Sequence, residues 1–255
     1  MFGAYLRKDI RVLLIGGGGT LGSYIINQKI FKRLDSPKKS ELNLLNTFSI
    51  RKFLNRKYNL IVNCAAIARM KECERNPFKA IRVNILGTSN LIKEILHYEN
   101  NYKKKIKLIH ISTDGVYPST EGNYSEKSPL KPYNVYGWTK LCSETIVQML
   151  KNYVIIRTRF FDKSNIRFNT AATDIFTSTI EVQSLVKEIK YISSIEFNGV
   201  INIGKKRKSD FENYKKFKKN IKPCKRKDVL QGISFKIAKD ASMNLSLLKK
   251  LKRKL

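Results

Sequence analysis

The chain has 255 residues, of which 42% are hydrophobic; this suits one large α/β domain, or a nucleotide-binding domain with a small lobe, and excludes a disordered chain. No apolar run reaches the ~20 residues that span a bilayer, and Lys8 and Asp9 come before any signal-peptide core, so we expect a cytoplasmic protein without a membrane anchor. The net charge of +31 comes from lysines spread along the whole chain; with frequent Asn and Ile, this is typical of an AT-rich coding sequence, and we expect no dedicated nucleic-acid binding.

Apolar strands alternate with helices over the first 159 residues. Uninterrupted apolar runs predict buried strands at residues 10–15, 59–64, 105–112 and 153–157. Helical periodicity predicts helices at 23–30, 78–98 and 136–150. This order implies right-handed βαβ units. The fold class that follows is α/β, a Rossmann-type doubly wound parallel sheet.

The pattern becomes less regular after Arg159. A helix is expected at 182–191, a short strand at about 199–204, and short helical pieces near 211–217 and 245–251. We therefore divide the chain into a dinucleotide-binding domain, residues 1–159, and a small substrate-binding lobe, residues 160–255, which returns the strand at 199–204 to the sheet.

A glycine-rich turn, GGGGTLG, follows the first predicted strand and opens a helix. Such a turn needs glycine dihedrals, and a pyrophosphate must approach bare backbone there. The first N–H groups of the helix then face the phosphates. The predicted cofactor contacts are Gly16, Gly19, Thr20, Leu21 and Gly22.

The adenosine end of this site leaves two alternatives open. Asp35 lies near the place where a carboxylate would bind a ribose 2′-hydroxyl, which favours NAD. Lys38 and Lys39 follow closely and could instead hold the 2′-phosphate of NADP. The sequence does not choose between NAD and NADP.

Tyr136 and Lys140 are four residues apart and share a helix face. A nearby ammonium, like an oxidised nicotinamide ring, favours the phenolate, so this pair could move a proton while hydride moves to a carbonyl carbon. Thr113, at the end of the third strand, could hydrogen-bond the same carbonyl oxygen. A second YxxxK pair, Tyr214 and Lys218, lacks this context and is assigned no role.

Charge and cysteine spacing indicate little further chemistry. The lysine clusters are expected to be solvated surfaces whose positive charge attracts an anionic substrate such as a nucleotide sugar. No two cysteines have CxxC spacing, which predicts ordinary thiols, with neither a metal site nor a disulfide framework. They are Cys64, Cys73, Cys142 and Cys224.

Together these motifs resemble the extended short-chain dehydrogenase/reductase superfamily, and among its branches the dTDP-4-dehydrorhamnose reductases and related nucleotide-sugar reductases. The likeness covers residues 10–160 well and the remainder faintly. It is carried by GGGGTLG at 16–22, IVNCAA at 61–66, RVN at 82–84, HISTDGVY at 110–117, PLKPYNVYGWTK at 129–140 and IIRTRFF at 155–161. Residues 238–251 match the family's C-terminal segment weakly.

The resemblance implies roles for matching positions. Thr113, Tyr136 and Lys140 would form the catalytic triad, with Lys140 also holding the cofactor ribose. Ala65 and Ala66 would line the cofactor. Substrate contacts would come from Asp114, Arg157 and Thr158.

Two departures from the resembled family bear on the reaction and on the cofactor. Gly115 stands where dehydratases of the superfamily carry a second carboxylate and where rhamnose-type reductases carry an aromatic residue. Dehydration therefore lacks its base. Asn43 replaces an aspartate that relatives often place near the adenine.

The leading hypothesis is an NAD(P)H-dependent reductase of a 4-keto nucleotide sugar in deoxysugar or surface-polysaccharide biosynthesis. A nucleotide-sugar epimerase on the same fold is the first alternative. A non-catalytic regulatory subunit is the second, because the beta subunit of methionine adenosyltransferase is similar to the same reductases. A homodimer is the expected assembly.

Overall fold

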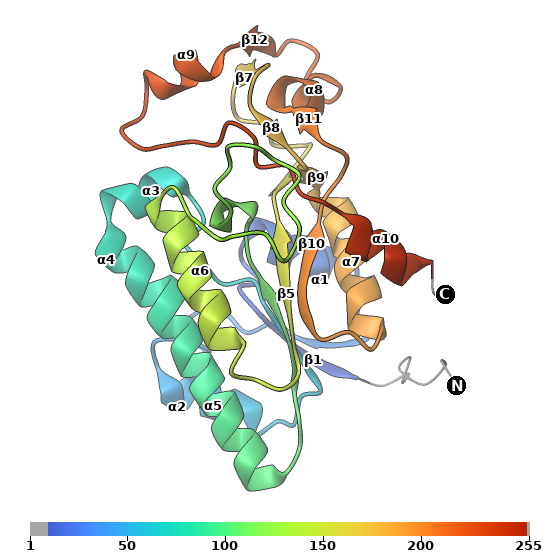
Figure 1. Cartoon of the computed structure of the whole chain (residues 1–255). Coiled ribbons are helices and arrows are strands. Elements are labelled where there is room, and N and C mark those ends of the chain that lie inside the picture. The colour runs from blue at the N-terminus through green and yellow to red at the C-terminus, as the bar shows by residue number, and fades with distance from the viewer. Residues whose placement is uncertain (1–9, 254–255) are drawn as a thin grey trace.

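A six-stranded parallel sheet forms the centre of the computed structural model, which describes residues 10–253 (Figure 1). The absence of a signal-peptide core was predicted from residues 1–9, which lie outside this range. The strand order is β10-β5-β4-β3-β1-β2. The chain adds β2 on one side of β1 and then adds β3 and the later strands on the other side, so the topological switch point lies between β1 and β3. The strands are β1 (Arg11–Ile15), β2 (Arg33–Asp35), β3 (Leu60–Asn63), β4 (Lys107–Ile111), β5 (Tyr153–Thr158) and β10 (Gly199–Ile203).

Helices cover both faces of the sheet, which confirms the predicted Rossmann-type doubly wound fold. On one face Val12 and Leu14 pack with α1 (Thr20–Asn27) and α7 (Val182–Ser194). On the other face Leu13 packs with three helices. These are α2 (Thr47–Leu54), α5 (Gly87–Tyr102) and α6 (Val135–Val147). Since successive side chains of a strand point to opposite faces, two covered faces require the uninterrupted apolar run of β1.

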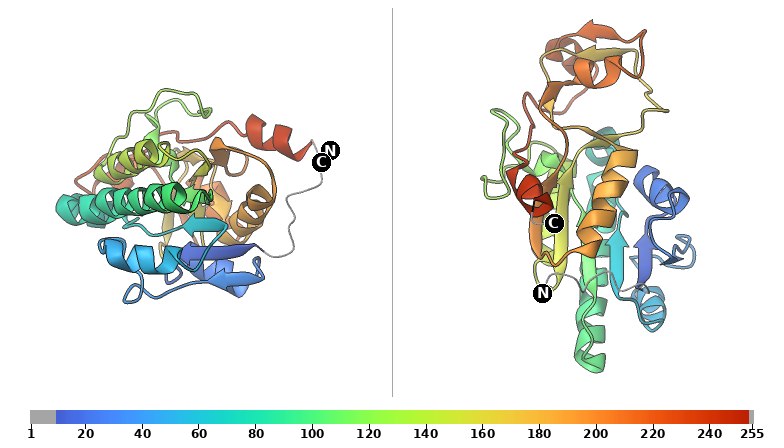
Figure 2. Two further views of the ribbon diagram at one scale, coloured as in Figure 1. Left: turned by 90° about the horizontal axis from the view of Figure 1, so that it is seen from below. Right: turned by 90° about the vertical axis from the view of Figure 1, so that its right-hand side faces the viewer.

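The chain after residue 159 serves both the sheet and a lobe above its carboxyl edge (Figure 2). The predicted helix and strand appear as α7 and β10, and β10 pairs in parallel with β5. In addition, α10 (Ser246–Lys252) packs on β10. The division at residue 159 stays a prediction. The lobe elements are β6 (Phe160–Phe161), β7 (Thr170–Ala172), β8 (Phe176–Thr177), β9 (Ile180–Glu181), β11 (Lys208–Ser209), α8 (Asp210–Lys215), β12 (Lys222–Cys224) and α9 (Arg226–Leu230).

The helix predicted at 78–98 is divided in the structure. It consists of α4 (Pro77–Ala80), the π-helical turn η1 (Ile81–Leu86) and α5. In η1, the Asn84 side chain accepts the Ile67 N–H at 2.8 Å and donates to Thr139 at 2.9 Å. It thereby ties the loop after β3 to α6. Periodicity alone cannot reveal a π turn, because the apolar pattern continues through it.

Several short elements were not predicted from the sequence. They are β2, α2, α3 (Met70–Arg75), the single-turn 3₁₀ helix η2 (Asp114–Val116) and most of the lobe strands. Each has eight residues or fewer, which gives hydrophobic periodicity little length to register. Within residues 10–253, no helix is both long and apolar enough to cross a membrane. All four cysteines are free thiols.

Candidate active site

The glycine turn lies at the carboxyl end of β1, beside the point where the strand order reverses. Gly16 has φ +89°, and a Cβ there would lie 2.7 Å from the backbone nitrogen of Ala65. A Cβ on Gly22 would lie 2.3 Å from the carbonyl oxygen of Gly16. Both positions therefore exclude a side chain, and the turn sits directly against the backbone after β3 and against α1.

The first turn of α1 offers unpaired backbone donors to this crevice. Its N-cap, Gly19, has no side-chain cap hydrogen bond, and no acidic residue lies in the first turn. The first N–H groups of a helix have no intrahelical partner and carry a partial positive charge. The predicted contacts Gly16, Gly19, Thr20, Leu21 and Gly22 all line the same cavity. Backbone without side chains, next to a helix N-terminus, fits a pyrophosphate.

The cleft has two connected parts that meet at the glycine turn. The inner part has a volume of about 420 Å³ and reaches α6; the outer part has a volume of about 650 Å³ and reaches the loop after β2. Gly16, Gly19, Cys64 and Ala66 line both parts, and Ala65 lines the outer one. An elongated cleft bent over a phosphate-binding turn has the shape that a dinucleotide requires.

The outer part does not contain the predicted ribose ligand Asp35. One carboxylate oxygen of Asp35 accepts hydrogen bonds from Arg11 at 2.9 Å and from Tyr58 at 2.5 Å. Because these contacts turn the carboxylate away from the cleft, Asp35 is absent from its lining. The lining is instead formed by Ser36, Pro37, Lys38, Lys39 and Asn43, among others.

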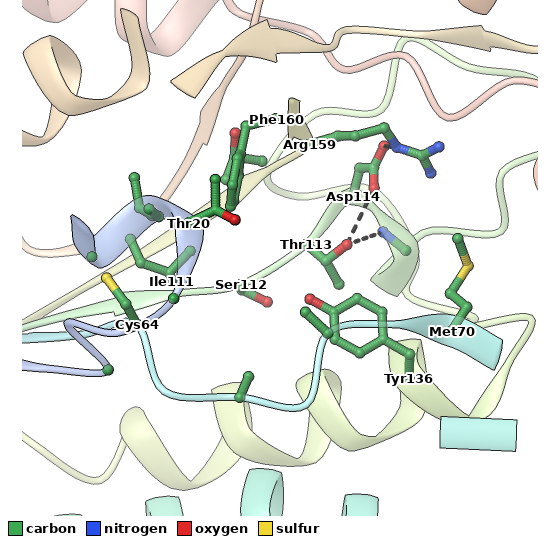
Figure 3. Close-up of a pocket in the computed structure, with 18 of the residues that line it drawn as sticks. Thr20, Cys64, Met70, Ile111, Ser112, Thr113, Asp114, Tyr136, Arg159 and Phe160 are labelled. Carbon is green, nitrogen blue, oxygen red and sulfur yellow. Dashed lines mark hydrogen bonds and ion pairs between the residues drawn. The ribbon is translucent and has the colours of Figure 1, made fainter. Parts of the chain in front are cut away.

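In the inner part, Thr113 and Tyr136 face the glycine turn. Figure 3 shows Tyr136 beside Thr113 and Ser112, with Thr20 and Cys64 across the cleft. Asn134 begins α6 by accepting the Gly137 N–H at 2.8 Å, which fixes where Tyr136 enters the cleft.

The phenol of Tyr136 is held in its protonated form. Burial and the nearby Asp114 carboxylate raise its pKa, while the Thr113 hydrogen bond and the Arg159 charge oppose the rise. Thr113 itself accepts the Gly115 N–H at 3.1 Å. A protonated phenol at this place can donate a proton to a bound carbonyl oxygen.

Lys140 shares the helix with Tyr136 but does not line the cleft. Its Nζ lies 3.0 Å from Nε2 of His110 on β4, and both residues are buried. Burial lowers the pKa of Lys140 to about 8, although Glu144 and Cys64 act in the opposite direction. The expected ammonium beside the phenol is therefore turned toward the sheet, and the cation near Tyr136 is Arg159.

Arg157, a predicted substrate contact, does not line the cleft. Its guanidinium lies 2.7 Å from Glu144 and 2.9 Å from the Tyr117 hydroxyl, and its side chain is 3% exposed. Thr158, the next residue of β5, lines the cleft. Alternation along the strand explains the difference, because Arg157 and Thr158 point to opposite faces of the sheet.

Arg159 is a cleft residue that the sequence did not single out. It follows β5 directly, lines the inner part, and binds the predicted substrate contact Asp114 at 2.6 Å. The hydroxyl of Thr158 is buried without a hydrogen-bond partner in the described part of the chain. The position of Arg159 directly after β5 could have identified it, because residues at the carboxyl ends of parallel strands surround the site in such sheets.

The sequence matches a family model over residues 10–180, that of the RmlD substrate binding domain. The chain is 29% identical over 160 residues to dTDP-4-dehydrorhamnose reductase of Mycolicibacterium smegmatis, which covers 60% of this chain and 47% of that protein. It is 31% identical over 148 residues to methionine adenosyltransferase 2 subunit beta of Rattus norvegicus, covering 54% and 42% of the two chains. The chain thus spans about half the length of the curated relatives it matches.

A solved structure shares the fold over nearly the whole chain. It is dTDP-4-dehydrorhamnose reductase from Bacillus anthracis in complex with NADP, with a TM-score of 0.84, 21% identity, and coverage of 95% of this chain and 93% of that one. At this identity the likeness concerns the fold. The family match covers well over half of the residues, and this protein therefore belongs to the RmlD substrate binding domain family.

Proposed function

We propose that this protein is an NADPH-dependent reductase of a 4-keto nucleotide sugar. The observation that carries the proposal is that Tyr136 and Thr113 line the same cavity as the glycine turn and the N-terminus of α1. A proton donor and a phosphate site thus lie on one side of the sheet, at its carboxyl edge. The relatives named as reductases of dTDP-4-keto sugars support the substrate class.

Five residues of the inner cleft have proposed tasks. Bound NADPH supplies the hydride. Tyr136, held protonated, donates its proton to the keto oxygen, and Thr113 hydrogen-bonds the same oxygen. Arg159 and Asp114 bind the sugar, and Thr158 offers its unpartnered hydroxyl. The absence of a carboxylate at Gly115 leaves a dehydration without its base.

The outer cleft favours NADPH over NADH. One carboxylate oxygen of Asp35 accepts hydrogen bonds from Arg11 and Tyr58, and Asp35 does not line the cavity where a ribose 2′-hydroxyl would lie. Ser36, Lys38 and Lys39 line the cavity at this end, and both lysines are exposed. Hydroxyl and ammonium groups are donors that suit a 2′-phosphate.

The test is NADPH consumption with a panel of nucleotide-linked 4-keto sugars. A reductase oxidises one NADPH for each sugar reduced. An epimerase converts the sugar with no net change in cofactor. If no keto sugar is turned over and the protein is isolated as a stable complex with an unrelated enzyme, the regulatory-subunit alternative replaces the proposal. A homodimer and a cytoplasmic location stay predictions from the sequence.

A further inference from the structure

Three buried side chains form a hydrogen-bonded row directly beneath the cleft. They come from three different elements: Asn63 ends β3, His110 lies on β4, and Lys140 lies on α6. Asn63 Nδ2 is 3.3 Å from His110 Nδ1, and His110 Nε2 is 3.0 Å from Lys140 Nζ. None of the three side chains is more than 2% exposed, so water does not compete for these contacts.

A backbone group fixes the orientation of the Asn63 amide. The Ala65 N–H donates to Oδ1 of Asn63 at 3.1 Å. Rotating the amide by half a turn would place its NH₂ group against this N–H, leaving two donors facing each other. The NH₂ group of Asn63 must therefore face His110.

This orientation determines where His110 carries its proton. The Asn63 NH₂ group donates to Nδ1, so Nδ1 is an acceptor without a proton. Burial lowers the pKa of His110 well below its usual value, so the ring is neutral. A neutral ring with a bare Nδ1 carries its proton on Nε2. That N–H points at Nζ of Lys140.

An ammonium cannot accept this hydrogen bond, because it has three donors and no lone pair. A neutral amine can. We propose that Asn63 and His110 are positioning residues that hold Lys140 as a neutral amine wherever Lys140 contacts His110.

The ionisable groups around Lys140 do not hold it as an ammonium at this contact. Glu144, one turn along α6, is taken up by a buried ion pair with Arg157 from β5. Cys64, after β3, is kept as a thiol because burial raises its pKa to about 12. From β4, the ring of His110 contributes no charge. Burial lowers the pKa of Lys140 itself to about 8, so the neutral amine that contacts His110 is the major form only above about pH 8.

The consequence for cofactor binding rests on the proposed function. If Lys140 holds a ribose of the dinucleotide as an ammonium, it must leave His110 and take up a proton. Affinity for NADPH should then be constant below about pH 8 and fall by up to tenfold for each pH unit above it. Binding above pH 8 should be accompanied by proton uptake.

The first experiment observes the tautomer without any ligand. The chain has two histidines, His97 and His110, so the ¹⁵N imidazole signals of the whole protein can be assigned with one His97→Gln variant. We expect His110 neutral with its proton on Nε2. A proton on Nδ1, or a charged ring at pH 7, overturns the proposal.

The second experiment replaces the amide donor by an acceptor. In Asn63→Asp, one oxygen can still accept the Ala65 N–H and the other can accept a proton from Nδ1. The His110 proton should move to Nδ1, and Nε2 should then accept from a Lys140 ammonium. In isothermal titrations at pH 8.5, the wild type should take up a proton when it binds NADPH, and its affinity for NADPH should fall above pH 8. The Asn63→Asp variant should take up no proton, and its affinity should stay constant up to pH 9.

The chain provides a matched control for this substitution. Asn101 faces the exposed His97, with Nδ2 3.0 Å from Nε2. Asn101→Asp should leave the His110 signals and the NADPH pH profile as in the wild type. An Asn63→Asp protein that switches the tautomer but keeps the wild-type pH profile refutes the link to cofactor binding. A wild type that binds no dinucleotide refutes the proposed function, and the tautomer measurement still tests the hydrogen bond from Asn63 to His110.

Discussion

The guanidinium of Arg157 and the carboxylate of Glu144 form an ion pair at 2.7 Å, with side chains 3% and 0% exposed. Removing one partner of such a pair leaves an uncompensated buried charge. We expect Arg157→Leu to lower the free energy of unfolding by about 3–5 kcal/mol in urea titrations.

The double variant Arg157→Leu/Glu144→Leu is the control for this prediction, since it removes both charges and should recover most of the lost stability. If Arg157→Leu keeps the wild-type free energy of unfolding but loses sugar binding, Arg157 contacts the substrate and does not stabilise the fold.

Tyr136→Phe removes the proposed proton donor and keeps the ring. Turnover of an active keto sugar should fall by about 10²–10⁴-fold, while NADPH affinity stays within about twofold. Steady-state NADPH oxidation and a binding titration measure the two effects. Tyr214→Phe, in the second YxxxK pair, should keep wild-type turnover. Wild-type activity in Tyr136→Phe would exclude this phenol as the donor.

Gly22→Ala should damage the dinucleotide turn. The added Cβ would lie 2.3 Å from the Gly16 carbonyl oxygen and 2.7 Å from Gly17 Cα, both of them backbone atoms. We expect a loss of about 1–3 kcal/mol in unfolding free energy and weakened NADPH binding. Gly18→Ala is the control, because a Cβ there meets nothing within 4 Å and should leave the unfolding transition unchanged. Equal effects at both positions would contradict the packing of α1 on the turn.

Lys38→Ala/Lys39→Ala should weaken NADPH binding about tenfold or more and change NADH binding by less than twofold, because NADH has no 2′-phosphate to hold. Fluorescence titrations with the two cofactors test this. Lys32→Ala, an exposed lysine before β2, controls for loss of general positive charge. A similar loss for both cofactors would remove the case for NADPH selection.

Arg159→Gln should raise KM for the keto sugar by about tenfold or more and leave the Kd of NADPH within about twofold. The substitution removes the cation that binds Asp114 at the inner end of the cleft. Initial-rate kinetics at saturating NADPH measure the first effect. A change in NADPH affinity with unchanged KM would place Arg159 at the cofactor instead.

The features that the sequence predicted well are those encoded by local pattern. The run at residues 10–15 reads as a buried strand because both faces of the sheet are covered, and that needs no knowledge of its neighbours. The turn from Gly16 to Gly22 is local backbone chemistry. Tyr136 could be placed because its helix follows the strand that ends at Thr113, and both meet the turn at the carboxyl edge.

The tertiary structure alone decided where charged side chains point and which partners they meet. Asp35 is taken up by Tyr58, 23 residues away, and Lys140 meets His110, 30 residues away. Arg157 and Arg159 look equivalent in sequence, yet only the second reaches the cleft. Hydrogen bonds and ion pairs form between groups that the fold brings within about 3 Å, and sequence spacing carries no information about that distance. The sequence by itself therefore determined the sheet, the glycine turn and the place of Tyr136, whereas long-range packing determined the charges around them.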